Sequence, residues 1–113
     1  MTAAHYRLDN LAAILDRNRL QIDGHTAEVM SIEPIADKWK AFGWHTLEVD
    51  GHDIPQLLSA LQTCRGVKER PSMIIAHTVK GKGVSIFEGK AKYHGVAPNP
   101  EEYQQALLEL GGT

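Results

Sequence analysis

The sequence contains one cysteine, Cys64, so no disulfide can form within the chain. A lone cysteine is typical of proteins kept in a reducing compartment, and we expect a cytoplasmic location. Cys64 continues the helical spacing of Leu57, Leu58 and Leu61, which favours a small buried side chain over a reactive thiol.

The chain also lacks long apolar runs and an excess of charge of one sign. No apolar run approaches the roughly 18 residues that a membrane span requires. Residues 1–5 show none of the charged and apolar regions of a signal peptide. The formal net charge is −2, which provides no basic field for nucleic acid. We therefore expect neither a membrane nor a nucleic acid as a partner.

What remains is an ordinary globular composition, 42% hydrophobic over 113 residues, which suits one small domain, 1–113. Three short apolar strands are predicted at 10–16, 44–49 and 72–76, the first typical of a strand buried on both faces. Helices are predicted at 35–42, at 54–64 with Asp53 as its cap, and from Asn99 or Pro100 onward, with Leu107, Leu108 and Leu110 on the apolar side of the last.

The alternation of strands and helices predicts parallel pairing with right-handed crossovers. The fold class is therefore α/β, with a partial doubly wound parallel sheet. Three strands alone would leave an edge and apolar faces uncovered. We expect this sheet to belong to a larger one and the chain to associate, as a homo- or hetero-oligomer.

Ligands in open α/β sheets bind beyond the carboxyl ends of the strands. The polar segment 17–26, predicted to be a loop, follows the first strand and begins with Asn18. An Asn side chain there, together with the backbone carbonyl of Leu20, can offer oxygen ligands to a hard cation. Alternatively, Asn18 satisfies its own backbone in a turn.

The glycine- and lysine-rich segment 79–100 is predicted to be mostly loop. Gly81 and Gly83 let the backbone approach a ligand, and Lys80 and Lys82 supply positive charge, so the segment can bind an anion. Its glycine spacing fits neither a phosphate-binding Walker loop nor a dinucleotide fingerprint. A solvated flexible loop is the alternative.

Histidines and acidic residues form no clear metal motif. His94, between Tyr93 and Gly95, could bind phosphate or shuttle protons, or could simply be solvated. The remaining histidines show no zinc spacing. The segment 50–53 is explained by a strand-to-helix turn, with Gly51 for the bend.

Individually these segments carry little information, but their order resembles that of transketolases, especially the N-terminal subunit of the form split between two genes. The matching blocks cover nearly the whole chain: Leu8–Leu11, Asp16–Asn18, Leu20–Gly24, Trp39–Trp44, Val49–Asp53, Ile75–Gly83 and Tyr93–Gly95.

The resemblance implies the C-terminal part of a thiamine-diphosphate-binding domain. It also implies an activity in carbohydrate metabolism through the pentose phosphate pathway. Thiamine diphosphate and a divalent metal, Mg²⁺ or Ca²⁺, would move a two-carbon ketol unit between sugar phosphates. By the same resemblance, Asn18 and the Leu20 carbonyl are metal ligands. Ile22 and Lys80 lie against the cofactor, and His94 contacts diphosphate and substrate as the catalytic residue.

One family motif is missing. The Gly-Asp-Gly motif, whose Asp is the main metal ligand, stands well before the metal-binding Asn, but only 17 residues precede Asn18 and none forms it. The pyrimidine-binding domain, with the Glu that activates the cofactor, is also missing. We expect an incomplete domain, inactive alone, that needs a complementary transketolase chain. A non-catalytic remnant and a stand-alone phosphate-binding α/β module are the alternatives.

Overall fold

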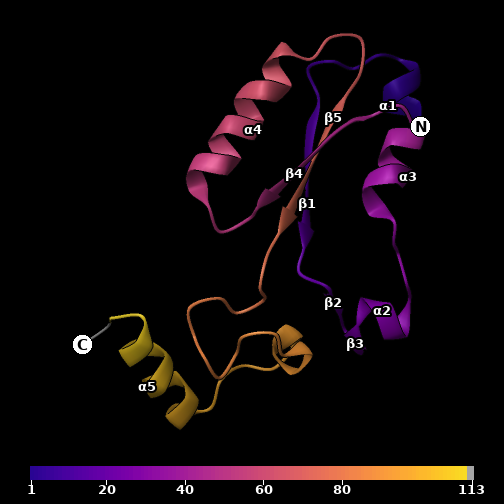
Figure 1. Ribbon diagram of the computed structural model, residues 1–113. Helices are drawn as coiled ribbons and strands as arrows, with labels where there is room; N and C mark the ends of the chain where they lie inside the picture. The colour runs from indigo at the N-terminus through magenta and orange to yellow at the C-terminus, as the bar shows by residue number, and fades with distance from the viewer. Residues whose placement is uncertain (112–113) are drawn as a thin grey trace. The chain divides into compact units, whose positions relative to one another are not determined.

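In the computed structural model, which describes residues 1–111, the chain folds as two units. The first unit combines Met1–Arg17 with Ile32–Thr78, and the second combines Asn18–Ser31 with Val79–Thr113. Figure 1 labels the helices and strands of each unit. The chain leaves the first unit after Arg17 and again after Thr78, each time directly beyond a strand.

A three-stranded parallel sheet forms the first unit, in the order β1-β5-β4, as the sequence predicts. Its strands are β1 (Ala12–Arg17), β4 (His45–Asp50) and the central β5 (Ser72–His77). Both outer strands pair in parallel with β5, so their carboxyl ends meet at one edge of the sheet. This confirms the predicted α/β fold and its strands to within two residues.

Helices cover both faces of this sheet (Figure 1). On one face, Ile35 of α3 (Ile35–Ala41) packs with Met73 and Ile75 of β5, and alanines of α1 (Thr2–His5) join them. On the other face, α4 (Ile54–Gly66) places Ala60 and Cys64 against Ile74. Cys64 is a free, buried cysteine, as predicted. The side chains of β5, buried on both faces, therefore hold the two apolar layers together.

The start of α4 is defined by its cap. Asp53 accepts a hydrogen bond from the backbone N–H of Gln56 (3.1 Å), and Pro55 occupies the first turn. Such a cap satisfies a backbone donor that would otherwise lack a partner. The turn at 50–53 thus has a structural explanation, as the sequence predicts.

Replacing Asp53 with alanine is expected to lower the free energy of unfolding by about 1 kcal/mol, because a backbone N–H loses its acceptor. Urea denaturation followed by circular dichroism measures the change. Asp53→Ser, which keeps a capping oxygen, is the matched control and is expected to remain near wild type. Equal losses in both variants would contradict the capping role.

One prediction about β1 is wrong. The apolar run predicts a strand buried on both faces, but its residues alternate between exposed and less exposed positions, and Ile14 is 55% exposed. The reason is position in the sheet. Among the described residues β1 is an outer strand, and α4 packs over β5 and β4 rather than over it. A continuous apolar run cannot distinguish a central strand from an outer one.

The end of β1 is anchored by an ion pair between buried Arg17 and the more exposed Glu33. Arg17 is 8% exposed, and its Nε donates to Glu33 Oε1 (3.1 Å). The same carboxylate accepts the backbone N–H of Ile35 through Oε2 (3.1 Å). Because Asn18 is the next residue in the chain, this pair sets the point at which the polar segment leaves the sheet.

The second unit contains a small hairpin where the sequence predicts only a loop. Its elements are β2 (Leu20–Gln21), β3 (Gly24–His25), α2 (Thr26–Val29), the 3-10 turn η1 (Ala91–His94) and α5 (Pro100–Glu109). The prediction of a loop over 17–26 is therefore wrong in part. Two-residue strands are too short for periodicity to reveal, and here they pair antiparallel with each other. The expectation that 79–100 is mostly loop is confirmed, with η1 as its only helical turn among the described residues.

Helix α5 begins with a capping box, in which Asn99 and Glu102 bond reciprocally to each other's backbone N–H. The predicted start of the helix is confirmed, but its predicted apolar side only in part, since Leu107 alone of the three leucines is half-buried. Leu108 and Leu110 are 76% and 65% exposed, and Ala106 is the buried residue instead. The helix therefore presents large apolar side chains to solvent in this chain.

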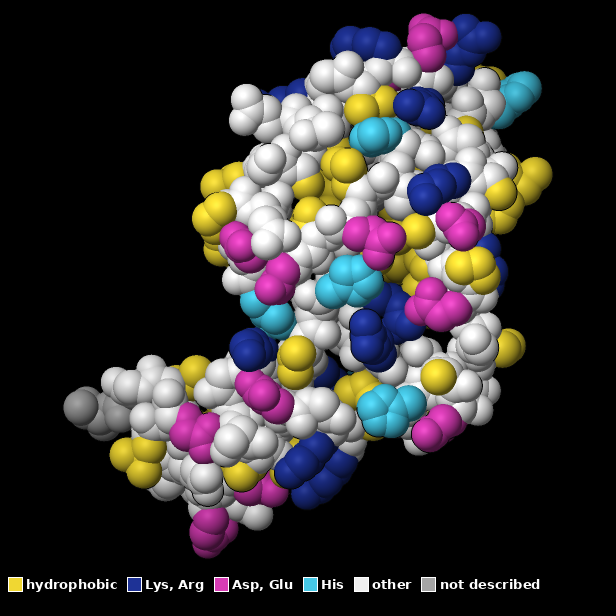
Figure 2. Space-filling model, viewed as in Figure 1, with side chains coloured by type: hydrophobic (Ala, Val, Ile, Leu, Met, Phe, Trp, Pro, Cys, Tyr) yellow, Lys and Arg dark blue, Asp and Glu magenta, His cyan; other side chains and the backbone are white. Residues whose placement is uncertain are grey.

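The visible surface carries acidic and basic side chains interspersed, with apolar side chains among them (Figure 2). No single sign of charge dominates that face, in line with the net charge of −2. Within residues 1–111, no helix has the length and apolar character needed to cross a membrane.

Candidate functional site

The hairpin of the second unit presents Asn18 at its start. The backbone N–H of Leu20 donates to Asn18 Oδ1 (2.9 Å), so the side chain closes a local turn, as the structural interpretation of the sequence predicts. A carbonyl oxygen has two lone pairs and can accept a second interaction. The turn therefore orients the Asn18 side chain and leaves one lone pair of its Oδ1 free to bind a ligand.

The lysine-rich loop of the second unit has a defined backbone. Gly81 adopts φ +73°, and a Cβ built there would meet the Phe87 carbonyl oxygen at 2.8 Å, so this close approach needs glycine. Lys82 lies 3.9 Å from Glu88, which offsets its charge. No ion pair within residues 1–111 involves Lys80, so its positive charge remains available to a ligand.

The turn η1, which carries His94, is tied to the start of α5. Tyr93 donates its hydroxyl to Glu102 Oε1 (2.8 Å), and Glu102 Oε2 accepts the backbone N–H of Asn99 (2.9 Å). Lys92 lies 3.5 Å from the same carboxylate and 4.9 Å from the Tyr93 ring. Phe87 packs edge-on against that ring at 4.5 Å.

These contacts shift the pKa values of two of their members, Glu102 and Lys92. The backbone N–H of Asn99, and next the Tyr93 hydroxyl, hold the pKa of Glu102 below its ordinary value, while Glu102 raises the pKa of Lys92. The ionised Glu102 stabilises the folded state fully at a pH well above the ordinary glutamate pKa. This stabilisation is lost as the pH falls through the lowered pKa of Glu102 in the folded protein. The network is thus intact at neutral pH.

These segments meet around one small pocket of about 30 Å³. It is lined by Asn18, Leu20, Gln21, Lys80, Ala91 and His94. Four residues singled out in the sequence therefore lie together, although more than 70 positions separate the first from the last. Asn18 and Leu20 offer oxygens, whereas Lys80 and His94 offer donors or positive charge. A volume close to that of one water molecule suits an ion, not a whole organic cofactor.

Two features of the pocket differ from the sequence expectation. Ile22 does not line it and is 68% exposed. Gln21, which sequence reasoning missed, does line it. Its Oε1 accepts the Asp23 N–H (2.8 Å), so the amide nitrogen remains as a further donor. Alternation along β2 could not identify Gln21 in advance, because the strand has only two residues.

The pocket offers only part of a metal site. Within the described residues, no three His, Cys, Asp or Glu side chains gather where a metal could bind. The oxygens of Asn18 and Leu20 are neutral, so a bound Mg²⁺ would need its remaining ligands from phosphate oxygens, water or other protein segments. The donor set thus fits a cation together with the anionic group that brings it.

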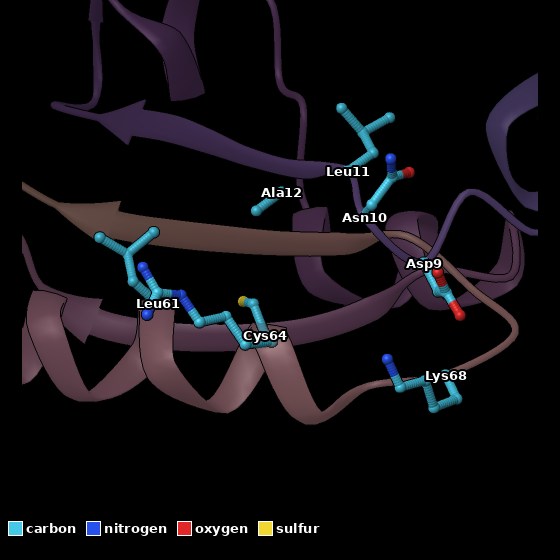
Figure 3. A pocket seen from close by; sticks show the side chains of 8 residues that line it. Asp9, Asn10, Leu11, Ala12, Leu61, Cys64 and Lys68 are labelled. Atoms are coloured by element: carbon cyan, nitrogen blue, oxygen red, sulfur yellow. The ribbon is translucent and has the colours of Figure 1, made fainter.

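A larger hollow of about 420 Å³ belongs to the first unit (Figure 3). It is formed by residues 9–12, before and at the start of β1, and by the C-terminal half of α4 with Lys68. Asp9 and Lys68 bring opposite charges to it, and Leu11 and Leu61 bring apolar surface. None of the site residues expected from the sequence lines it.

Comparison with known proteins shows which family this chain resembles in sequence. Residues 1–112 match the family described as transketolase, thiamine diphosphate binding domain. An apulose-4-phosphate transketolase subunit of Phocaeicola vulgatus is 46% identical over 97% of this chain and 39% of its own length. A 6-deoxy-6-sulfo-D-fructose transketolase subunit of a Clostridium species is 44% identical over 97% of this chain and 40% of its own. The chain thus spans about two fifths of these relatives.

Solved structures agree with this match. Transketolase from Campylobacter jejuni superposes with a TM-score of 0.90 at 30% identity, over 98% of this chain and 17% of that one. Transketolase from Leishmania mexicana gives a TM-score of 0.88 at 32% identity, with the same two coverages. The similarity extends through both units of the chain.

Proposed function

This chain belongs to the transketolase family, within its thiamine-diphosphate-binding domain, and we propose that it supplies part of a transketolase active site that other segments complete. The pocket that gathers Asn18, Leu20, Lys80 and His94 is the observation that carries the proposal. The whole chain would then act as one incomplete domain, whose hairpin and loops form a share of the cofactor site.

Each residue has a role that its chemistry supports. Asn18 Oδ1 and the Leu20 carbonyl would bind Mg²⁺ or Ca²⁺, which favour oxygen ligands. Lys80 and His94 would bind the diphosphate of thiamine diphosphate, and Gln21 would donate to the same anion. His94 would also hold the substrate, and Ile22 would pack against the cofactor, as the family resemblance implies. When bound, thiamine diphosphate supplies the carbanion chemistry of ketol transfer.

A complementary chain is part of the proposal. Both curated relatives are named as one subunit of a transketolase, which supports a second subunit that carries the remaining segments, including the pyrimidine-binding domain. The exposed apolar side chains Ile14, Leu108 and Leu110 are surfaces that such an assembly would cover. Because relatives are named for a phosphorylated and a sulfo-substituted sugar, we propose anionic sugars, with sugar phosphates first, as substrates.

The test compares the chain alone with the chain plus its complementary segments. Alone, it is expected to show no ketol transfer and only weak binding of thiamine diphosphate with Mg²⁺, because its own oxygen ligands are neutral and its loops must be ordered. With the complementary chain, sedimentation should show a complex, and calorimetry should show tight, Mg²⁺-dependent binding with ketol transfer. Adjacent reading frames that encode the missing segments identify the chain to add.

Two outcomes would overturn the proposal. Tight, Mg²⁺-dependent cofactor binding by the isolated chain would show a complete site rather than a share of one. A complex without such binding, in which the chain still binds inorganic phosphate, would favour the phosphate-binding module instead. The lack of a carboxylate metal cluster among the described residues is the observation that favours this second candidate.

A further inference from the structure

We propose that Glu102 is a positioning residue, which acts through Tyr93 to hold the turn η1 and so places His94 at the pocket. The inference rests on the proposed function of His94 and adds a residue from α5 to that site. Glu102 does not line the pocket. Its influence would reach the pocket only through the turn that it binds.

The first step is the wall that η1 forms. Two of its four residues, Ala91 and His94, line the pocket, and Tyr93 lies between them. His94 itself is exposed, so packing around its own ring does little to hold it. The position of its backbone must therefore come from its neighbours.

The second step is the anchor. Tyr93 is partly buried, and its hydroxyl donates to Glu102 Oε1 at 2.8 Å while Phe87 packs against its ring. The Glu102 side chain is only 21% exposed, and its other oxygen is held by the N–H of Asn99 at 2.9 Å. Since the capping box fixes the carboxylate to α5, the helix provides a rigid acceptor for the tyrosine.

The third step is charge. A hydrogen bond to an ionised acceptor is stronger than one between neutral groups. Lys92 at 3.5 Å from the same carboxylate favours its ionised form. Two successive residues of η1, Lys92 and Tyr93, thus converge on Glu102. The turn is attached to α5 immediately before His94.

The experiment titrates the full chain with inorganic diphosphate and follows the backbone amides of Lys80 and Gly81 by NMR, which detects millimolar binding and can be read in variants that lack the His94 ring. Tyr93→Phe removes only the hydroxyl and leaves the capping box intact. We expect it to weaken diphosphate binding about 3- to 10-fold, in line with the net contribution of one ordinary hydrogen bond, because the lost bond acts on the pocket only indirectly. The exposed Tyr103 of α5 provides the matched control, and Tyr103→Phe should bind as wild type.

A second pair of variants separates positioning from general loosening. If Tyr93 acts through His94, then Tyr93→Phe has no further effect in the His94→Ala background. Additive losses would overturn the inference, because they show an effect independent of His94. Amide exchange of α5 should remain unchanged in Tyr93→Phe, and unfolding of that helix would likewise overturn it.

The outcomes also distinguish the inference from the proposed function. If His94→Ala weakens diphosphate binding but Tyr93→Phe does not, Glu102 has no positioning role and the proposed site stands. If His94→Ala leaves binding unchanged, the assignment of His94 fails, and the inference fails with it.

Discussion

Replacing Asn18 with alanine is expected to weaken the Mg²⁺-dependent affinity of the complete, two-chain protein for thiamine diphosphate about 10- to 100-fold. The substitution removes one of the two neutral oxygens that we propose as metal ligands from this chain. It also removes the acceptor of the Leu20 N–H, so the turn that directs both ligands loosens. Calorimetry with and without Mg²⁺ measures the effect, which should be largest when the metal is present.

Asn18→Asp is the matched variant for this prediction. An aspartate keeps an oxygen acceptor for the Leu20 N–H and a ligand for the cation, so metal-dependent binding should be retained. Asn10→Ala, in the first unit, controls for a general effect of removing an amide. Full affinity in Asn18→Ala would remove the assignment, as would an equal loss in Asn18→Asp.

Replacing Gly81 with alanine should open the lysine-rich loop and displace Lys80. Gly81 has φ +73°, and the added Cβ would lie 2.8 Å from both the carbonyl oxygen and the Cβ of Phe87. The left-handed backbone alone costs about 1–2 kcal/mol with a side chain. Overlap with a neighbour in place adds about 1–3 kcal/mol. Hydrogen exchange of the loop amides, measured by mass spectrometry, reports this local loss of stability.

Gly89 in the same loop provides the control. Its φ is +67°, but a Cβ there meets nothing within 4 Å, so Gly89→Ala carries the backbone cost without the overlap. Loop exchange in Gly81→Ala should therefore exceed that in Gly89→Ala by about 5- to 150-fold, the equivalent of about 1–3 kcal/mol. Equal exchange in the two variants would show that the approach of Phe87 does not require glycine.

Much of the fold follows from local pattern. The strands and helices of the first unit, the cap at Asp53 and the burial of Cys64 all agree with periodicity and capping chemistry. Parallel pairing follows because helices separate the strands. The errors lie where burial depends on neighbours: Ile14 on β1, Leu108 on α5 and Leu110 just beyond that helix are apolar side chains that this chain leaves exposed.

Some residues of the candidate site were expected from the sequence, and others are recognised only in the structure. The resemblance carried by the order of the segments pointed to Asn18, Leu20, Lys80 and His94, whereas residue type beyond the strand ends suggested ion binding but left a turn, a flexible loop and a solvated histidine as alternatives. Gln21 and Glu102 were not identified. The first reaches the pocket only because β2 pairs with β3, and the second acts only because α5 lies beside η1. Both depend on contacts that no local pattern records.

The sequence by itself determined the family, the α/β class and the residue types offered to a ligand, because these depend on short segments and their order. Only the tertiary structure decided which of those residues share a pocket, and that Ile22 stands outside it. The physical reason is the distance along the chain. Asn18 and His94 meet through the pairing and packing of separate segments, and side-chain spacing within a segment carries no information about that packing.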